Sequence, residues 1–149
     1  MLNLLRSTPR PQTLQPGPAH NAEYMTRGKK PDAAIREAKK FAERMGYRWQ
    51  ENTDNPGLGY DLQVFKPGYA MLVKVRVPRY HINPNSFYED LLEDDLRDVR
   101  DLPFPAWMPR EIWLRTRHER GWRRLRVHER AVAEIEWWKP DEYTNPYAR

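Results

Sequence analysis

Arginine and tryptophan alternate along two neighbouring segments in the last third of the chain. Residues 112–117 and 122–127 flank a short loop at 118–121, and this arrangement predicts a β-hairpin. Because side chains alternate between the two faces of a strand, six of them share one face of this hairpin: Trp113, Arg115, Arg117, Trp122, Arg124 and Arg126. Such a flat basic surface is suited to nucleic acid, since arginines contact phosphates and tryptophans stack on unpaired bases.

The register of the predicted hairpin decides how these charges meet. A four-residue loop places Arg115 opposite Arg124, and like charges directly opposite each other destabilise a sheet. Two candidates could neutralise the pair, a bound nucleic acid or the acidic segment at 86–101. Cation–π pairs with the two tryptophans are a third, purely structural interpretation. The other face of the hairpin is apolar and is predicted to be core: Ile112, Leu114, Leu125 and Val127.

Composition favours one domain, and its basic excess fits either an anionic partner or pairing with the chain's own acidic segment. The chain has 149 residues, a net charge of +5 and no cysteine, which excludes disulfides, thiolate zinc sites and cysteine nucleophiles. Residues 110–130 hold eight arginines against three acids, whereas residues 85–101 hold seven acids against two arginines. The four histidines show no metal-ligand spacing and are interpreted as surface or turn residues. No apolar run approaches the ~20 residues of a membrane span, so no membrane partner is expected.

Periodic patterns predict an α/β domain with a mixed central sheet and the order α-β-β-β-α-β-β. A helix is predicted over 31–45, because apolar residues recur at helical spacing between Pro31 and Gly46. A second helix is predicted over 86–101, beginning with a capping box of Ser86 and Glu89. Strands are predicted over 47–51, 60–66, 70–77, 112–117 and 122–127, with a further short strand over 131–137.

The ends of the chain differ in composition from its middle. Residues 1–29 are rich in proline, carry a basic excess and lack apolar periodicity, so they are predicted to form a flexible arm. Residues 139–149 are predicted to form a flexible tail, and residues 30–138 the folded domain. Arg6 and Arg10 precede the first acid at Glu23, so an organelle-targeting segment stays open beside a cytoplasmic or nucleoid-associated location.

Several short motifs, taken in chain order, resemble the PD-(D/E)XK, or restriction-endonuclease-like, nuclease superfamily. Gly46-Tyr47 follows the first helix, Gly59-Tyr60-Asp61-Leu62 opens one strand, and Met71-Leu72-Val73-Lys74-Val75-Arg76 forms the next. Ile112-Trp113-Leu114 and Gly121-Trp122-Arg123 are most similar to the archaeal Holliday-junction-resolvase branch. The resemblance covers about residues 31–136 and implies a restriction-endonuclease-like fold with a mixed central sheet flanked by helices.

The same resemblance assigns candidate catalytic residues. In this superfamily an aspartate and an acid-x-lysine pair on adjacent strands bind Mg²⁺ and support the attacking water. Asp61 matches the aspartate, but Lys74 occupies the acid position and Arg76 the lysine position. Since Mg²⁺ needs hard oxygen ligands, Asp61 could be joined only by Glu37 from the helix, the Gln63 amide or an acid from another element. The site is therefore interpreted as vestigial or weak, or as a partly buried ion-pair cluster.

Three functions are consistent with these patterns. The first is a nucleic-acid-binding protein with a nuclease-like fold, no cleavage activity and no cofactor, with DNA favoured over RNA. The second is an active Mg²⁺-dependent, structure-selective endonuclease, which predicts at least two carboxylates around Asp61. The third is a structural or interaction subunit of a larger ribonucleoprotein or protein assembly, which the proline-rich arm and Trp137-Trp138 would serve. Resemblance to the resolvases adds a homodimer as the expected assembly.

Overall fold

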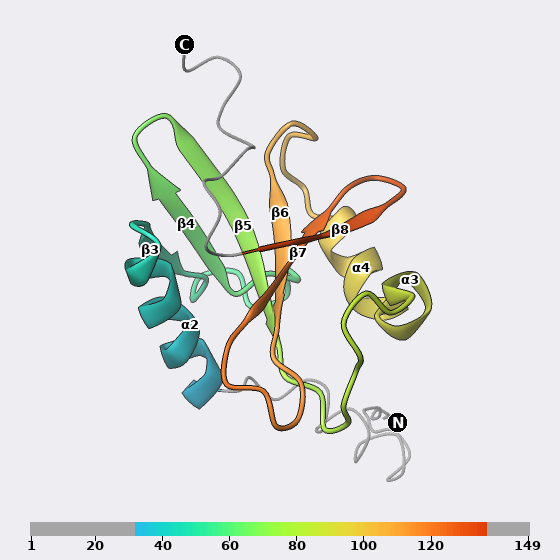
Figure 1. The fold of residues 1–149 in the computed structure, drawn as a ribbon. Helices are drawn as coiled ribbons and strands as arrows, with labels where there is room; N and C mark the ends of the chain where they lie inside the picture. Colours follow the sequence, from blue (N-terminus) through green and yellow to red (C-terminus); the bar gives the residue numbers. More distant parts are fainter. Residues whose placement is uncertain (1–31, 137–149) are drawn as a thin grey trace, which may run out of the picture. The chain divides into compact units, whose positions relative to one another are not determined.

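A computed structural model describes residues 32–136 of the chain. The predictions of a flexible arm over 1–29 and a flexible tail over 139–149 lie outside the described residues. Two helical layers and one sheet make up the described part (Figure 1). The predicted α/β fold with a mixed sheet is confirmed.

The six strands of the sheet follow each other in space in the order in which they occur along the chain. They are β3 (Arg48–Glu51), β4 (Leu62–Lys66), β5 (Tyr69–Arg76), β6 (Arg110–Leu114), β7 (Arg123–Val127) and β8 (Val132–Ile135). All neighbouring pairs are antiparallel except β5 and β6, which are parallel. The short turn at Pro67 and Gly68, where Gly68 has a φ of +76°, connects β4 to β5. A helical crossover connects β5 to β6, as a parallel pair requires.

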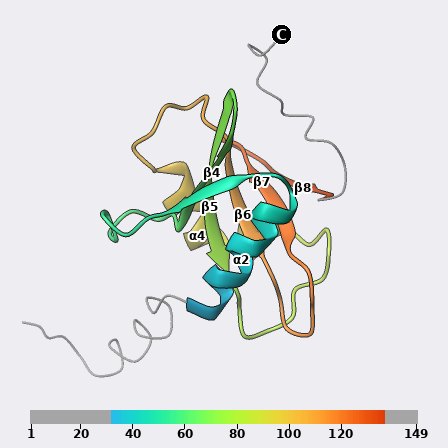
Figure 2. The ribbon, with the colours of Figure 1, turned by 90° about the vertical axis from the view of Figure 1, so that its left-hand side faces the viewer.

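Helix α2 (Asp32–Arg44) covers one face of the sheet (Figure 2). Its buried side recurs at helical spacing, as the sequence pattern predicted: Ala34, Ile35, Ala38, Phe41 and Ala42. This side packs on alternate residues of β4, β5 and β6, including Leu62, Val73 and Trp113. The helix ends before Gly46, which has a φ of +87° that favours glycine.

The opposite face of the sheet is covered by two short helices, α3 (Tyr88–Leu91) and α4 (Glu93–Arg100). Leu92, Leu96 and Val99 point into a second apolar cluster with residues of β5, β6 and β7. The prediction of one continuous helix over 86–101 is wrong, because the chain leaves helical geometry at Leu92, with φ −121° and ψ 33°. The Ser86 capping box is also wrong, since the Ser86 hydroxyl donates to the Asn83 carbonyl instead.

Arg110, at the start of β6, holds the end of α4 and the chain that follows it. Its guanidinium donates to the carbonyls of Val99 at 2.9 Å and Phe104 at 2.7 Å. Further bonds reach the carbonyls of Arg100, Leu102 and Pro105. A helix leaves its last carbonyls without intrahelical donors, and one buried side chain supplies them here. Burial lowers the pKa of Arg110 from its ordinary value.

Gly59, shortly before β4, allows α4 to lie close to the backbone at this position. A Cβ atom at this position would lie 2.8 Å from the Cβ of Asp98 in α4. Gly59→Ala therefore has to push α4 outward, and we expect it to lower the free energy of unfolding by about 1–3 kcal/mol. Urea unfolding monitored by tryptophan fluorescence measures this loss.

Gly57→Ala is the matched control, because a Cβ atom there meets nothing within 4 Å. We expect its free energy of unfolding to stay within about 0.5 kcal/mol of wild type. Equal values for the two variants would contradict the close approach of α4 at Gly59.

Candidate nucleic-acid interface

The β6–β7 hairpin pairs in a register two residues away from the predicted one. Trp113 lies opposite Arg124, and Glu111 lies opposite Arg126. Strand β6 ends at Leu114, so Arg115 lies beyond the paired region and no Arg115–Arg124 pair forms. The turn is consequently longer than four residues, and it runs from 115 to 122. The face that each residue occupies is unchanged, because the shift is an even number of residues.

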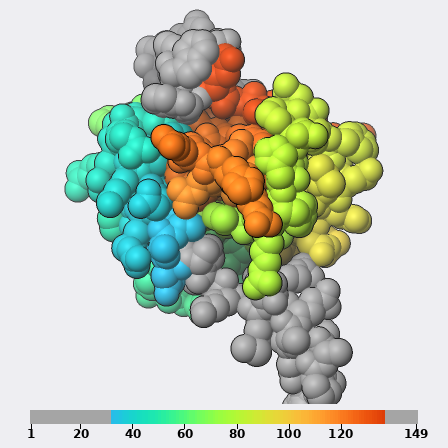
Figure 3. All heavy atoms as spheres, turned by 60° about the horizontal axis from the view of Figure 1, so that its bottom comes forward, coloured from blue at the N-terminus to red at the C-terminus, as the bar shows by residue number. Residues whose placement is uncertain are grey.

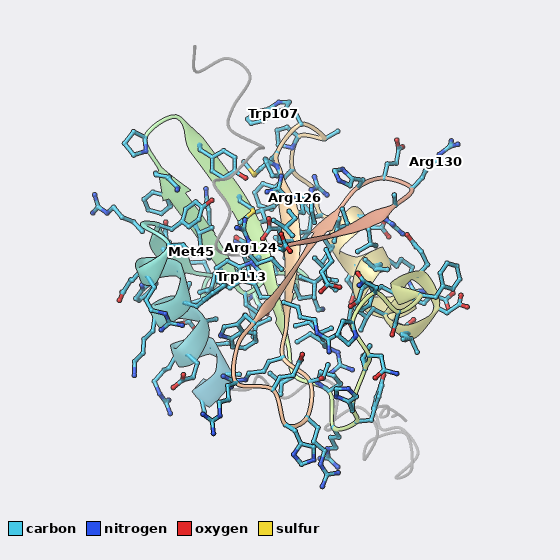
Figure 4. The ribbon with its side chains drawn as sticks, in the orientation of Figure 1. Met45, Trp107, Trp113, Arg124, Arg126 and Arg130 are labelled. Carbon is cyan, nitrogen blue, oxygen red and sulfur yellow. The ribbon has the colours of Figure 1, made fainter. Side chains whose placement is uncertain are left out.

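The predicted flat basic platform is not exposed, which corrects the sequence-based prediction. Trp113 is 0% exposed, Arg124 and Arg126 are each 2% exposed, and Trp122 is buried. Trp113 meets Phe41 of α2 edge-on, with ring centroids 5.1 Å apart. Figure 4 shows Trp113, Arg124 and Arg126 within the fold, with Met45 beside them. Four of the six predicted binding residues are therefore part of the interior and offer no open surface to a phosphate or a base: Trp113, Trp122, Arg124 and Arg126.

Glu111 neutralises the two buried arginines. Its carboxylate accepts from Arg124 Nε at 2.8 Å and Nη2 at 2.8 Å. It also accepts from Arg126 Nε at 2.9 Å and from Trp113 Nε1 at 2.8 Å. The sequence pattern predicted nucleic acid or the acidic helix for this role, and not Glu111. Glu111 could have been identified from its position two residues before Trp113, because this spacing places both side chains on the same face of the strand.

Lys74 and Arg76, two of the candidate catalytic residues, form ion pairs with α4. Lys74 Nζ lies 3.5 Å from Asp95 Oδ1 and 3.6 Å from Asp98 Oδ2. Arg76 Nε donates to Asp95 Oδ2 at 2.8 Å. The acidic face of this helix thus neutralises cations of the sheet. The structure accordingly contains the ion-pair cluster that the sequence allowed for these two residues.

Asp61 and Glu37 are placed apart from each other. Asp61 directly precedes β4, and its Oδ2 accepts from the backbone N–H of Val75 in β5 at 2.7 Å. Glu37 is exposed on α2, which covers the face opposite to α4. Across residues 32–136, no group of three or more His, Asp or Glu side chains is arranged to hold a metal ion.

Exposed arginines gather instead where two loops meet at one end of the sheet. We define the hairpin-end surface as Arg79, Tyr80, His81, Arg115, Arg117 and Arg120. His81 Nδ1 lies 3.2 Å from Thr116 Oγ1 and 3.4 Å from the Arg117 carbonyl oxygen, so the two loops are in contact. Figure 3 shows them side by side, with the β6–β7 loop in orange and the segment after β5 in yellow-green.

Glu119 is the only acid between residues 115 and 122, and its carboxylate is hydrogen-bonded within the domain. Its Oε1 accepts from the Thr116 N–H and hydroxyl, each at 2.8 Å, and its Oε2 accepts from Arg123 Nε at 2.9 Å. Burial alone would raise the pKa of Glu119, but these hydrogen bonds outweigh it and lower the pKa. Within residues 32–136, Arg79, Arg117 and Arg120 have no carboxylate within ion-pair distance.

Arg115 lies on Trp122 rather than on an acid. The guanidinium carbon is 4.4 Å from the centroid of the indole ring. A guanidinium stacked in this way keeps its charge and its in-plane donors, and its plane is held by the ring beneath it. Arg115 is half-buried, and Arg117 and Arg120 are exposed. Of the six predicted binding residues, Arg115 and Arg117 are therefore the two that reach the surface.

No family model, curated protein or solved structure matches this chain. No helix within residues 32–136 is long and apolar enough to cross a membrane. The support for the candidate interface therefore comes from its geometry and its charge.

Replacing the buried carboxylate tests the interior charge cluster. Glu111→Gln keeps the shape of the side chain but leaves Arg124 and Arg126 without their shared negative charge. We expect a loss of about 3–5 kcal/mol in the free energy of unfolding, as for other broken buried pairs. Urea unfolding measures it.

Glu89→Gln is the matched control, since the Glu89–Arg100 pair is partly exposed. We expect that variant to lose less than about 1 kcal/mol. A similarly small loss for Glu111→Gln would show that Glu111 does not carry the stability of the cluster.

Proposed function

We propose that the protein binds nucleic acid through its hairpin-end surface. The observation that carries this proposal is the set of arginines from two contacting loops, without a carboxylate partner among residues 32–136. Guanidinium groups that are not neutralised by the fold attract phosphates and bind them bidentately. The remaining cations of the same hairpin are satisfied internally, so the proposal is restricted to the loops.

Charge elsewhere on the described domain supports this location. Helices α3 and α4 together hold six acids and two arginines, and both arginines pair with acids of these helices. Helix α2 has nearly balanced charge, with four cations and three acids. A polyanion is repelled by the first helical layer and is only weakly attracted by the second. The hairpin-end surface is the part of the domain with the clearest positive excess.

We further propose that the domain is nuclease-like and does not cleave at the candidate catalytic residues. The support is the element order α2-β3-β4-β5-α3-α4-β6, with Asp61 directly before β4 and hydrogen-bonded to Val75, the residue after Lys74 on β5. Lys74 places positive charge where the resemblance expects a metal-binding carboxylate, while Arg76 keeps the positive charge expected at the lysine position. Their pairing with Asp95 and Asp98 leaves these acids engaged, so the cluster has little attraction for Mg²⁺.

Removal of two hairpin-end arginines tests the binding proposal. We expect Arg79→Gln combined with Arg117→Gln to weaken binding of a labelled oligonucleotide about ten-fold or more at low salt. The slope of log affinity against log salt should become shallower by about two, since two phosphate contacts are lost. Fluorescence anisotropy at several salt concentrations, in EDTA, measures both quantities.

The matched control removes two exposed arginines from elsewhere, Arg97→Gln combined with Arg130→Gln. Arg97 lies on the acidic helix α4, and Figure 4 places Arg130 at the end of the sheet away from the β6–β7 loop. We expect nearly unchanged affinity and slope. Equal losses in the two double variants would indicate attraction by net charge alone, and no binding by wild type would refute the proposal.

Reversing one charge tests the nuclease-like placement. Lys74→Glu puts a carboxylate beside Asp61, Asp95 and Asp98, and mutual repulsion should lower the melting temperature in EDTA. A divalent cation should then bind the cluster, and Mn²⁺ at ten times its dissociation constant would restore about 1.4 kcal/mol, or several degrees. Differential scanning fluorimetry with and without Mn²⁺ measures the difference.

Lys74→Gln is the control, because it removes the cation without adding an acid. We expect no more stabilisation by Mn²⁺ in this variant than in wild type. If Lys74→Glu also melts at the same temperature with and without Mn²⁺, the carboxylates are not arranged as the nuclease-like proposal requires.

A further inference from the structure

Tyr80 is the one large aromatic residue exposed on the hairpin-end surface. It is 49% exposed and stands between Arg79 and His81 in the chain. Two large aromatic residues of the described part are more exposed, Phe87 directly before α3 and Trp107. Trp107 lies in the loop before β6, at the far end of the sheet in Figure 4. An exposed ring beside arginines from two loops is therefore particular to this surface.

The backbone on both sides of Tyr80 is fixed to the domain. Pro78 and Ile82 are buried, and the Ile82 carbonyl accepts from the Arg123 guanidinium. His81 Nδ1 lies 3.2 Å from Thr116 Oγ1 and 3.4 Å from the Arg117 carbonyl oxygen, so the segment also contacts the β6–β7 loop. A ring displayed from an anchored segment loses less conformational freedom when it stacks than one on a free loop.

We infer that the ligand of this surface is single-stranded nucleic acid, with an unpaired base stacked on Tyr80. The inference rests on the proposed function and specifies its ligand. Arg79, Arg117 and Arg120 would contact successive phosphates, and the Arg115–Trp122 stack offers a second planar group to a neighbouring base. Single-strand binders combine a positive track with aromatic stacking in this way.

Duplex nucleic acid fits the same surface less well. Inside a duplex the faces of the bases are stacked on each other, so an aromatic side chain has only the phosphates and groove edges to meet. Arginines alone would account for duplex binding, and Tyr80 would then contribute nothing to affinity. Stacking is tolerant of base identity because every base has a π-face, so little sequence preference is expected.

The test compares Tyr80→Ala, Tyr80→Phe and Trp107→Ala on two probes of equal length. One probe is a labelled single-stranded 20-mer without self-complementarity, and the other is the blunt duplex of that sequence. We expect wild type to prefer the single strand at moderate salt. Tyr80→Ala should lose about ten-fold affinity for the single strand and leave duplex affinity within two-fold. Tyr80→Phe should retain single-strand affinity, because the phenyl ring still stacks.

Trp107→Ala controls for the loss of any exposed aromatic residue, and its affinities should match those of wild type. Equal effects of Tyr80→Ala on both probes, or none on the single strand, would overturn the inference while leaving the binding proposal intact. A wild-type preference for the duplex would do the same. If wild type binds neither probe at low salt, the proposed function itself fails. Because Tyr80 is exposed, circular dichroism should report an unchanged fold in both Tyr80 variants.

Discussion

The centre of the sheet depends on the buried carboxylate of Glu111, which neutralises two buried arginines. Strand β7 places Arg124 and Arg126 on the α2 side of the sheet, where both are almost completely removed from water. Isolated charges in such an environment cost several kcal/mol each, and Glu111 on the neighbouring strand offsets that cost through four guanidinium contacts and the Trp113 indole. Helix α2 can cover this region because the charges beneath it are neutralised.

The cations of the sheet and its loops, within residues 32–136, therefore divide into groups with different roles. The hairpin arginines pair with Glu111 inside the sheet, Lys74 and Arg76 pair with the acidic helix α4, and Arg110 holds carbonyl groups. The arginines of the hairpin-end surface have neither kind of partner within residues 32–136. Net charge thus overstates how much of the molecule can attract an anion, and the location of the unneutralised cations decides where a ligand could bind.

Sequence patterns predicted the helices and strands better than they predicted which faces of the sheet are buried. Apolar spacing placed α2 and most of the strands close to their observed bounds, but the strand predicted over 112–117 is observed as Arg110–Leu114. Alternation also predicted which hairpin residues share a face, yet it contained no information on what covers that face. The side chain of Phe41, distant in the chain, packs on Trp113 and changes a predicted binding surface into core.

Local competition explains the remaining errors. Ser86 matched a helix cap, but its hydroxyl is used within the preceding turn, and this choice depends on a few local hydrogen bonds. The hairpin register depended on loop length, and Glu119 organises a longer loop through Thr116 and Arg123. For the candidate site, the motif resemblance selected Asp61, Lys74 and Arg76, whereas the partners of Lys74 and Arg76 on α4 could be identified only from the tertiary structure.

The parallel pairing of β5 with β6 divides the sheet into two antiparallel meanders, β3–β5 and β6–β8. Within each meander the strands are connected by loops of ten residues or fewer and can associate quickly. The two meanders meet only after the 33 residues from 77 to 109 close into a crossover, at an entropic cost of about 3 kcal/mol before any constant term. We expect this seam to form late in folding, after each meander has assembled around its own local contacts.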